Sequence, residues 1–369
     1  MRILITGGAG FIGSHLADEL LRRGHTVRAL DNLSPQVHGA AAERPAYLSC
    51  DVELIRGDVR DADTVRRALR DIDAVYHFAA AVGVGQSMYE IDHYTSVNNG
   101  GTAVLLQALI DRPVQRLVVA SSMSLYGEGM YRAPDGSIVP GHERPLEQLR
   151  AGDWEVRNES GDALTPIPTP ESKAASLSSI YALSKFDQER MCLLTGRAYN
   201  MPTVALRFFN VFGTRQSLSN PYTGVLAIFA SRLLNDRPPL IFEDGLQRRD
   251  FVSVEDVAQA CVLALEAPEA DGRAFNVGSG HAYTIRDVAR MLGAILGKSI
   301  DPDVCGKYRV GDIRHCFADI SEAQRTLGYQ PRVTLEEGLV GLAAWLQEQA
   351  PDDRVAHASR ELAARGLTV

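Results

Sequence analysis

The chain has 369 residues, of which 45% are hydrophobic and 23% charged, and its formal net charge is −8. This composition is typical of one large or two unequal globular domains, and the acidic balance disfavours nonspecific binding to nucleic acid or to an anionic membrane. No apolar run reaches membrane-spanning length and no secretory signal precedes the first predicted strand, so we expect a cytoplasmic protein. The five cysteines are scattered, as in reduced proteins, and the nine histidines show no metal-ligand spacing, so we predict no metal site.

A glycine-rich turn follows the first predicted strand, over residues 2–6. Its glycines allow a tight turn and let a pyrophosphate approach the start of the next helix, where free N–H groups favour an anion. A second strand, over residues 26–30, ends in an acid that would bind both adenosine ribose hydroxyls and repel a 2′-phosphate. The pattern predicts a dinucleotide-binding βαβ unit that prefers NAD to NADP, with cofactor contacts from Gly7, Gly10, Phe11, Ile12, Gly13, Asp31 and Asn32.

Four further apolar runs predict strands over residues 53–56, 74–78, 114–120 and 204–208. Helical spacing predicts helices over about 61–69 and 94–109 and from Ser179 onward. Strands and helices that alternate in this way predict an α/β fold, a doubly wound parallel sheet of the Rossmann type, in residues 1–208.

Residues at the ends of these strands are expected to contact the cofactor. Asp58 and Val59 would flank an adenine ring, although Asp58 could also serve as the N-cap of the following helix. The small residues 79–81 would let a flat cofactor lie against the strand ends. The cofactor residues predicted here are Asp58, Val59, Phe78, Ala79, Ala80 and Ser121.

Two segments depart from this regular alternation. Residues 127–180 form a long insertion rich in proline, glycine and charge, which we expect to be a compact lid rather than a disordered loop. From residue 209 the pattern loosens, which predicts a smaller mixed domain over residues 209–349, laid over the carboxyl ends of the strands and interleaved with the first domain. Residues 350–369 are expected to form a helix or a frayed tail.

Tyr181 and Lys185 stand four residues apart on a predicted helix and so share one face. A phenol with a pKa near 10 is a poor base at neutral pH, but a lysine ammonium and a nicotinamide cation would both favour the phenolate. The pair could then take a proton from a sugar hydroxyl while hydride leaves for NAD, with Ser122 bonded to the same oxygen. A tyrosine and a lysine at this spacing are common on helices. The glycine turn and the paired serines at 121 and 122 strengthen the interpretation that this pair is catalytic.

These motifs together resemble the extended short-chain dehydrogenase/reductases, in particular the NAD-dependent nucleotide-sugar epimerase/dehydratase group. The residues that carry the resemblance are GGAGFIG, Asp31, Asp58–Val59, the Ser-Ser-x-x-x-Tyr-Gly stretch and YALSK, and the similarity extends over residues 1 to about 345. It implies bound NAD, a nucleotide-diphosphate sugar as substrate, and a homodimer formed by the helices at about 94–110 and 180–198. It further implies cofactor contacts from Asn98, Tyr181, Lys185 and Phe209, and substrate contacts from Ser122, Ser124, Asn210, Val225, Arg249, Arg309, Asp312 and Cys316.

One departure narrows the expected reaction. In the family's 4,6-dehydratases and uronate decarboxylases an acid stands two residues before the tyrosine of the serine-rich motif, where this chain has Ser124. We therefore predict a 4-epimerase, in which Tyr181 takes the proton of the 4-hydroxyl, hydride moves to NAD, and hydride returns to the other face of the 4-keto sugar. The insertion and the segments QSMYEIDHYTSVNN and SNPYTGVLAIF resemble dTDP-L-rhamnose 4-epimerases, and a UDP-hexose is the other substrate considered.

Two alternatives stay open. The first is an NAD-dependent nucleotide-sugar oxidoreductase, dehydratase or UDP-glucuronate decarboxylase on the same scaffold. The second is a non-catalytic dinucleotide sensor, which would not need the three candidate catalytic residues Tyr181, Lys185 and Ser122.

Overall fold

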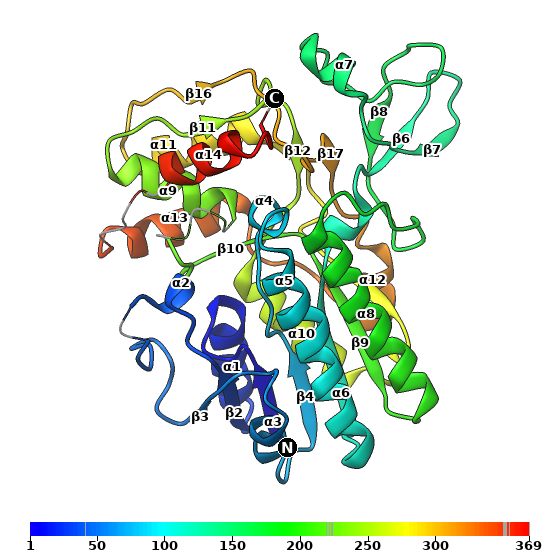
Figure 1. The fold of residues 1–369 in the computed structure, drawn as a ribbon, viewed down its shortest axis with the longest axis vertical. Coiled ribbons are helices and arrows are strands. Elements are labelled where there is room, and N and C mark those ends of the chain that lie inside the picture. The colour runs from blue at the N-terminus through cyan, green and yellow to red at the C-terminus, as the bar shows by residue number, and fades with distance from the viewer. Residues whose placement is uncertain are drawn as a thin grey trace.

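A sheet of seven parallel strands lies at the centre of the computed structural model, which describes residues 1–40, 42–218, 220, 222, 224–349, 353 and 355–368. In spatial order the strands are β3 (Glu53–Arg56), β2 (Thr26–Asp31), β1 (Arg2–Thr6), β4 (Ala74–His77), β5 (Arg116–Ser122), β9 (Thr203–Phe208) and β14 (Ala274–Val277). Each neighbouring pair is parallel. The predicted doubly wound α/β fold is therefore confirmed (Figure 1).

Helices cover both faces of this sheet, which explains why its strands read as continuous apolar runs. Ile3 and Ile5 point into one core, whereas Leu4 between them points into the other. The first face is covered by α1 (Phe11–Arg22), α10 (Val254–Glu266) and α12 (Ser321–Leu327). The second face is covered by α3 (Ala62–Ala68), α6 (Gly101–Asp111) and α8 (Ile180–Ala198).

The helix predicted over residues 94–109 begins earlier and contains a wide turn. It consists of α5 (Ile91–Tyr94), a π-helical segment η1 (Thr95–Gly100) and α6. Wide turns of this kind are rare in proteins, and those that occur are often found at functional sites. Asn98 lies in this turn, and its side chain is fully buried.

The N-cap of α3 differs from the expectation. Asp61, not Asp58, caps the helix, because its carboxylate accepts a hydrogen bond from the Asp63 N–H at 3.0 Å. Asp58 instead forms an ion pair with Arg60 at 2.8 Å. Asp58 therefore does not fill the alternative role of N-cap, because α3 begins only at Ala62.

The C-terminal half lies over the carboxyl ends of the sheet strands (Figure 1). Here α9 (Val225–Leu234), α11 (Ile285–Ile295) and α13 (Leu335–Leu346) pack around a core that includes Phe212 and Phe251. Short pairs of strands link them: β10 (Asn210–Phe212) with β13 (Phe251–Ser253), and β11 (Leu240–Ile241) with β16 (Asp303–Val304). A three-stranded sheet joins β15 (Tyr283–Thr284), β12 (Arg248–Arg249) and β17 (His315–Cys316).

Residues from this half also belong to the main sheet, since β14 is its edge strand and α10 and α12 cover one of its faces. The C-terminal stretch contains α14 (Val355–Ala364), and residues 350–352, 354 and 369 of the predicted tail lie outside the described residues. Within the described ranges, no helix combines the length and apolar character needed to cross a bilayer.

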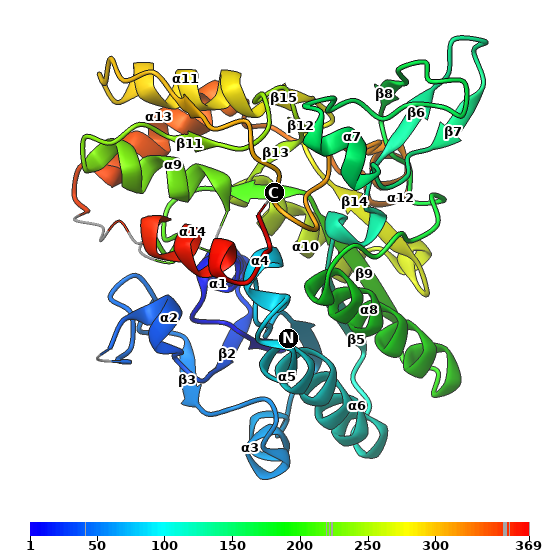
Figure 2. The ribbon, with the colours of Figure 1, turned by 45° about the horizontal axis from the view of Figure 1, so that its top comes forward.

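The insertion between β5 and α8 folds into a unit at one corner of the molecule (Figure 2). Its three antiparallel strands are β6 (Met130–Arg132), β7 (Ile138–Pro140) and β8 (Thr165–Ile167), and they are accompanied by α7 (Leu146–Arg150). The unit has a small core of its own around Tyr131, Val156 and Leu164.

Candidate active site

The glycine turn between β1 and α1 forms a cradle with no room for side chains. Gly7 has a φ of +73°, which favours glycine, and a Cβ added at Gly13 would lie 2.4 Å from the Gly7 carbonyl oxygen. Helix α1 begins after Gly10 with no side-chain cap, and its first turn contains no acid. The positive end of the helix dipole and its free N–H groups therefore fit a diphosphate.

Asp31, at the end of β2, ties the cradle to the neighbouring strand. Its carboxylate accepts hydrogen bonds from the N–H groups of Ala9 at 3.0 Å and Leu33 at 2.9 Å. His38 approaches it at 3.7 Å, and burial lowers the pKa of this histidine despite the neighbouring carboxylate. Both backbone contacts use the Asp31 carboxylate as a hydrogen-bond acceptor, which is the role that binding of ribose hydroxyls requires.

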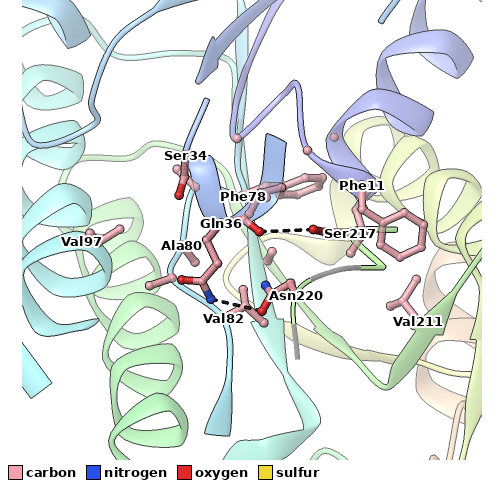
Figure 3. A pocket seen from close by; sticks show the side chains of 18 of the residues that line it. Phe11, Ser34, Gln36, Phe78, Ala80, Val82, Val97, Val211, Ser217 and Asn220 are labelled. Carbon is pink, nitrogen blue, oxygen red and sulfur yellow. Dashed lines mark hydrogen bonds between the residues drawn. The ribbon is translucent and has the colours of Figure 1, made fainter. Parts of the chain in front are cut away.

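A cavity of about 440 Å³ extends from the cradle across the strand ends to α9 (Figure 3). Its size suits a bound small molecule or cofactor. Sixteen of the predicted cofactor residues line it: Gly7, Gly10, Phe11, Ile12, Gly13, Asp31, Asn32, Asp58, Val59, Phe78, Ala79, Ala80, Ser121, Tyr181, Lys185 and Phe209. Of the predicted substrate residues, Ser122, Asn210 and Val225 line it as well, whereas residues 127–180 contribute nothing to the lining.

Asn98 was predicted at the cofactor but lies behind the cavity wall. Its amide oxygen accepts from the Ala81 N–H at 2.7 Å, and its nitrogen donates to the Ala81 carbonyl and to the Ser184 hydroxyl, the latter at 2.8 Å. The side chain thereby ties the segment after β4 to α8, the helix that carries Tyr181. Asn98 therefore holds α8 in position and does not itself line the cavity.

Tyr181 stands in the first turn of α8, which Ser179 caps through a bond from the Ala182 N–H. Burial raises the pKa of Tyr181, and a hydrogen bond from the Ser122 hydroxyl lowers it in part. Ser122 accepts two hydrogen bonds from Ser124, from the hydroxyl at 2.9 Å and from the N–H at 3.2 Å. With its acceptor positions used, the Ser122 hydroxyl is directed to donate its proton to the phenol oxygen.

Lys185, which was expected to favour the Tyr181 phenolate, is hydrogen-bonded to a residue of its own helix. Its buried ammonium donates to the Gln188 side-chain oxygen at 2.6 Å, and burial lowers the pKa of Lys185 to about 8. In this structure the contact that lowers the pKa of Tyr181 is the hydrogen bond from Ser122, whereas the Lys185 ammonium is held by Gln188. Gln188 was not predicted, although its place three residues after Lys185 on the helix put it within reach.

Behind Gln188 lies a neutral hydrogen-bond network. The Gln188 amide nitrogen donates to the Thr102 hydroxyl at 2.9 Å, and Thr102 donates to the Asn98 carbonyl oxygen. His77 bridges the Thr6 and Thr102 hydroxyls at 2.8 Å each, and burial, together with Lys185, lowers the pKa of His77 to about 3. The only charge in this chain of contacts is therefore that of Lys185.

Five predicted substrate residues do not line the cavity: Ser124, Arg249, Arg309, Asp312 and Cys316. The structure nevertheless pairs four of them, and Ser124 bonds to Ser122. Arg249 and Cys316 are register partners on β12 and β17, and the Arg249 guanidinium donates to the carbonyl oxygens of residues 248 and 314 at 2.9 Å. Arg309 and Asp312 form an ion pair at 2.7 Å, so both arginines are engaged by protein groups in this structure.

Among the residues that the structure describes, two buried side-chain oxygens that line the cavity have no protein partner: Oδ1 of Asn210 and Oε1 of Gln216. Buried polar atoms are nearly always hydrogen-bonded, so both oxygens mark places where a ligand donor would be accommodated. Asn210 was predicted from the sequence. Gln216 was missed, because no local pattern distinguishes it from other glutamines.

A buried charge cluster fixes the insertion to β17. Arg314, fully buried, bonds to Glu243 at 2.8 Å, to Asp244 at 2.6 Å and also to Glu155 of the insertion. Arg144 of the insertion bonds to Glu243 at 2.9 Å. The insertion thus positions the strand that carries Cys316, and no sequence motif indicated this cluster.

The chain is similar to known proteins along nearly its whole length. The model of the NAD dependent epimerase/dehydratase family matches residues 3–148 and 159–278. The chain is 37% identical over 354 residues to dTDP-L-rhamnose 4-epimerase of Burkholderia thailandensis, covering 94% of this chain and 95% of that protein. It is 32% identical over 341 residues to UDP-glucose 4-epimerase of Mycolicibacterium smegmatis, covering 92% and 96% of the two chains. UDP-glucuronic acid 4-epimerase of Bacillus cereus, solved with UDP-glucuronic acid and NAD, superposes with a TM-score of 0.78 at 28% identity, covering 94% and 99%.

Proposed function

The chain belongs to the NAD-dependent epimerase/dehydratase family, and from this premise we propose that it is a nucleotide-sugar 4-epimerase. The relatives described above are 4-epimerases. Among their substrates we favour a dTDP-linked 6-deoxyhexose such as dTDP-L-rhamnose, since the relative at 37% identity carries that name, and a UDP-hexose is the second choice. The observation that carries the proposal is the hydrogen-bonded series Ser124, Ser122 and Tyr181 at the edge of the cavity.

In the proposed reaction, NAD held by the glycine cradle and Asp31 would supply the acceptor and donor of the hydride at carbon 4 of the sugar. Tyr181 takes the proton of the 4-hydroxyl and gives it back after the 4-keto sugar has turned. Ser122 donates a hydrogen bond to the phenol oxygen, which stabilises the phenolate against the effect of burial. Lys185 supplies a buried ammonium held by Gln188, and the Asn210 amide oxygen is available to the substrate.

The second candidate, an oxidoreductase, dehydratase or uronate decarboxylase on this scaffold, has less support. Elimination of water is helped by an acid that protonates the leaving hydroxyl. The position expected to hold that acid is Ser124, and its hydroxyl donates to Ser122. An epimerase needs no further proton donor there.

We also infer a homodimer and a cytoplasmic location. The helices at residues 91–111 and 180–198 present exposed apolar side chains, among them Ile91, Leu183 and Leu194 at 41–51% exposure. Exposed apolar side chains on neighbouring helices are typical of an interface between subunits. The mass of the protein in solution, by light scattering, tests this inference.

The reaction is tested on purified protein without added cofactor. The protein is incubated separately with dTDP-L-rhamnose, UDP-glucose and UDP-glucuronate, with products followed by NMR and reduced nicotinamide by absorbance. An isomer inverted at carbon 4, at unchanged mass and without net NADH, supports the proposal and identifies the sugar. Accumulating NADH, or a product lighter by water or carbon dioxide, supports the second candidate instead.

The base is tested with Tyr181→Phe, which should retain NAD and lose turnover. Tyr199→Phe, at a half-exposed tyrosine at the other end of α8, is the matched control and should keep full activity. Normal turnover by Tyr181→Phe would refute the role given to this tyrosine.

A further inference from the structure

Three side-chain amides from distant parts of the chain meet at the rim of the cavity. Gln36 belongs to α2 (Pro35–His38), Gln86 to α4 (Val84–Ser87), and Asn220 to the segment between β10 and α9. All three line the cavity, and Figure 3 shows Gln36 reaching toward Asn220 across it. We call this set the amide clasp.

Gln36 and Gln86 bond reciprocally. The Gln36 nitrogen donates to the Gln86 oxygen at 3.0 Å, and the Gln86 nitrogen donates to the Gln36 oxygen at 3.3 Å. Gln86 also donates to the Glu90 carboxylate at 3.2 Å and accepts from the Tyr94 hydroxyl at 3.1 Å. Because a carboxylate can only accept, Glu90 fixes which end of Gln86 carries the nitrogen, and this in turn fixes the orientation of Gln36.

The clasp continues to the substrate side of the cavity. With its orientation fixed, the Gln36 nitrogen donates to the Asn220 oxygen at 3.2 Å, and that oxygen also accepts from the Tyr222 N–H at 3.1 Å. The Ser217 hydroxyl donates to the Gln36 carbonyl oxygen at 3.3 Å. Gln86 and Asn220 are 7% and 8% exposed, whereas Gln36 is exposed at the rim.

The clasp connects a segment that follows the predicted cofactor residues to a segment that lies among the predicted substrate residues. Gln36 follows Asp31, the residue proposed for the adenosine ribose, and Asn220 lies in the sequence between Asn210 and Val225, which are proposed for the substrate. Through the bond from Gln36 to Asn220, the clasp thus joins the segment after β2 to the segment before α9. It is also uncharged, so it closes the rim without repelling or trapping the charges of a diphosphate.

We propose that the amide clasp retains NAD in its site between turnovers. This inference rests on the proposed function, because an epimerase returns the hydride it has taken and gains nothing by exchanging its cofactor. Release of NAD requires α2 to separate from α4 and from the Asn220 segment, and the hydrogen bonds of Gln36 oppose that separation. Gln36 and Gln86 are positioning residues in this scheme, since they act on the cofactor through the closure of the rim.

The test is the release of the cofactor, measured apart from catalysis. NADH is loaded into purified protein, an excess of NAD is added, and the loss of NADH fluorescence gives the dissociation rate. Gln36→Ala removes three side-chain hydrogen bonds, so we expect release to be about ten- to hundredfold faster. The NAD content of the protein as purified should fall in parallel.

Controls separate this role from a general loss of structure. Gln324→Ala, at an exposed glutamine of α12, should release NADH at the wild-type rate. Because Gln36 and Gln86 bond to each other, their effects on the release rate should not multiply. If the pair acts as a unit, the double variant should release NADH markedly more slowly than the product of the two single-variant rate increases predicts. Unfolding midpoints of the NAD-free variants report whether each one is folded.

The outcomes are distinct. Unchanged release and NAD content in folded Gln36→Ala and Gln86→Ala overturn the clasp, whatever the enzyme does with sugars. Faster release from these variants supports the clasp even if no tested nucleotide sugar is epimerised, in which case the proposed function fails alone. Strictly multiplicative effects in the double variant contradict a shared action of the two amides.

Discussion

Replacing Lys185 by methionine should alter how the stability of the protein depends on pH. The lysine is 3% exposed, and burial lowers its pKa from 10.5 to about 8. At 1.36 kcal/mol for each pH unit, the buried ammonium destabilises the folded protein by about 3 kcal/mol at pH 7. Methionine has a similar length and carries no charge, so the variant is free of this cost.

The direction of the change in stability with pH follows from the pKa of Lys185, which is lower in the folded protein than in the unfolded one. Below pH 8 the lysine is charged in both folded and unfolded protein, and the cost is fully present. Between pH 8 and 10.5 the folded protein releases its proton first, so the wild type becomes more stable relative to Lys185→Met as the pH rises. Loss of the partner of Gln188 costs the variant about 1–3 kcal/mol, but this term is the same at every pH.

The assay is urea unfolding of both proteins, freed of cofactor, at pH 7 and pH 10.5. From pH 7 to pH 10.5 the free energy of unfolding of the wild type should rise by about 3 kcal/mol relative to that of the variant. All other groups titrate in both proteins and cancel in the difference. Lys307→Met, at an exposed lysine, is the matched control and should show a constant difference from wild type. A constant difference for Lys185→Met would refute the reasoning.

Three further predictions follow from contacts described above. Gly13→Ala places a Cβ 2.4 Å from the Gly7 carbonyl oxygen and should abolish NAD retention; full nucleotide content in the purified variant would contradict the cradle. Asp31→Asn removes the charge that disfavours a 2′-phosphate, so binding of NADP should strengthen relative to NAD in a fluorescence titration of the reduced forms, and an unchanged ratio would contradict the role of the acid. Arg314→Met leaves the carboxylates of Glu155, Glu243 and Asp244 without their shared cation and should destabilise the protein by about 3–5 kcal/mol in urea unfolding; a loss below about 1 kcal/mol would show that the cluster relaxes.

The features that could be predicted from the sequence are those fixed by short-range geometry. The glycine turn depends on neighbouring residues, and the apolar runs of β1 and β2 reflect burial on both faces of the sheet. Tyr181 and Lys185 share a helix face through their spacing alone. For these reasons the sheet and the wall of the cavity around the cradle agree with expectation.

Contacts that depend on convergence of distant segments could not be predicted. Gln36 and Gln86 are 50 positions apart, and neither stands in a pattern that indicates a partner. Arg314 resembles any surface arginine until the insertion folds against β17. The cap of α3 was misplaced because Asp58 and Asp61 are both favourable near a helix start, and only the backbone decides between them.

The edge strand β14 has a consequence for the newly made polypeptide. Its residues pair with β9, and Ala205 N–H donates to the carbonyl of Arg273 just before β14. Chains leave the ribosome N-terminus first, so β9 emerges while the strand that will cover it has yet to be translated. During that interval the outer edge of β9 is an open template for another nascent chain. A premature stop codon after β9 and before position 274 makes this exposure permanent, and the resulting fragments should aggregate through β9 even though every residue of the glycine cradle and of the Tyr181 helix has been synthesised.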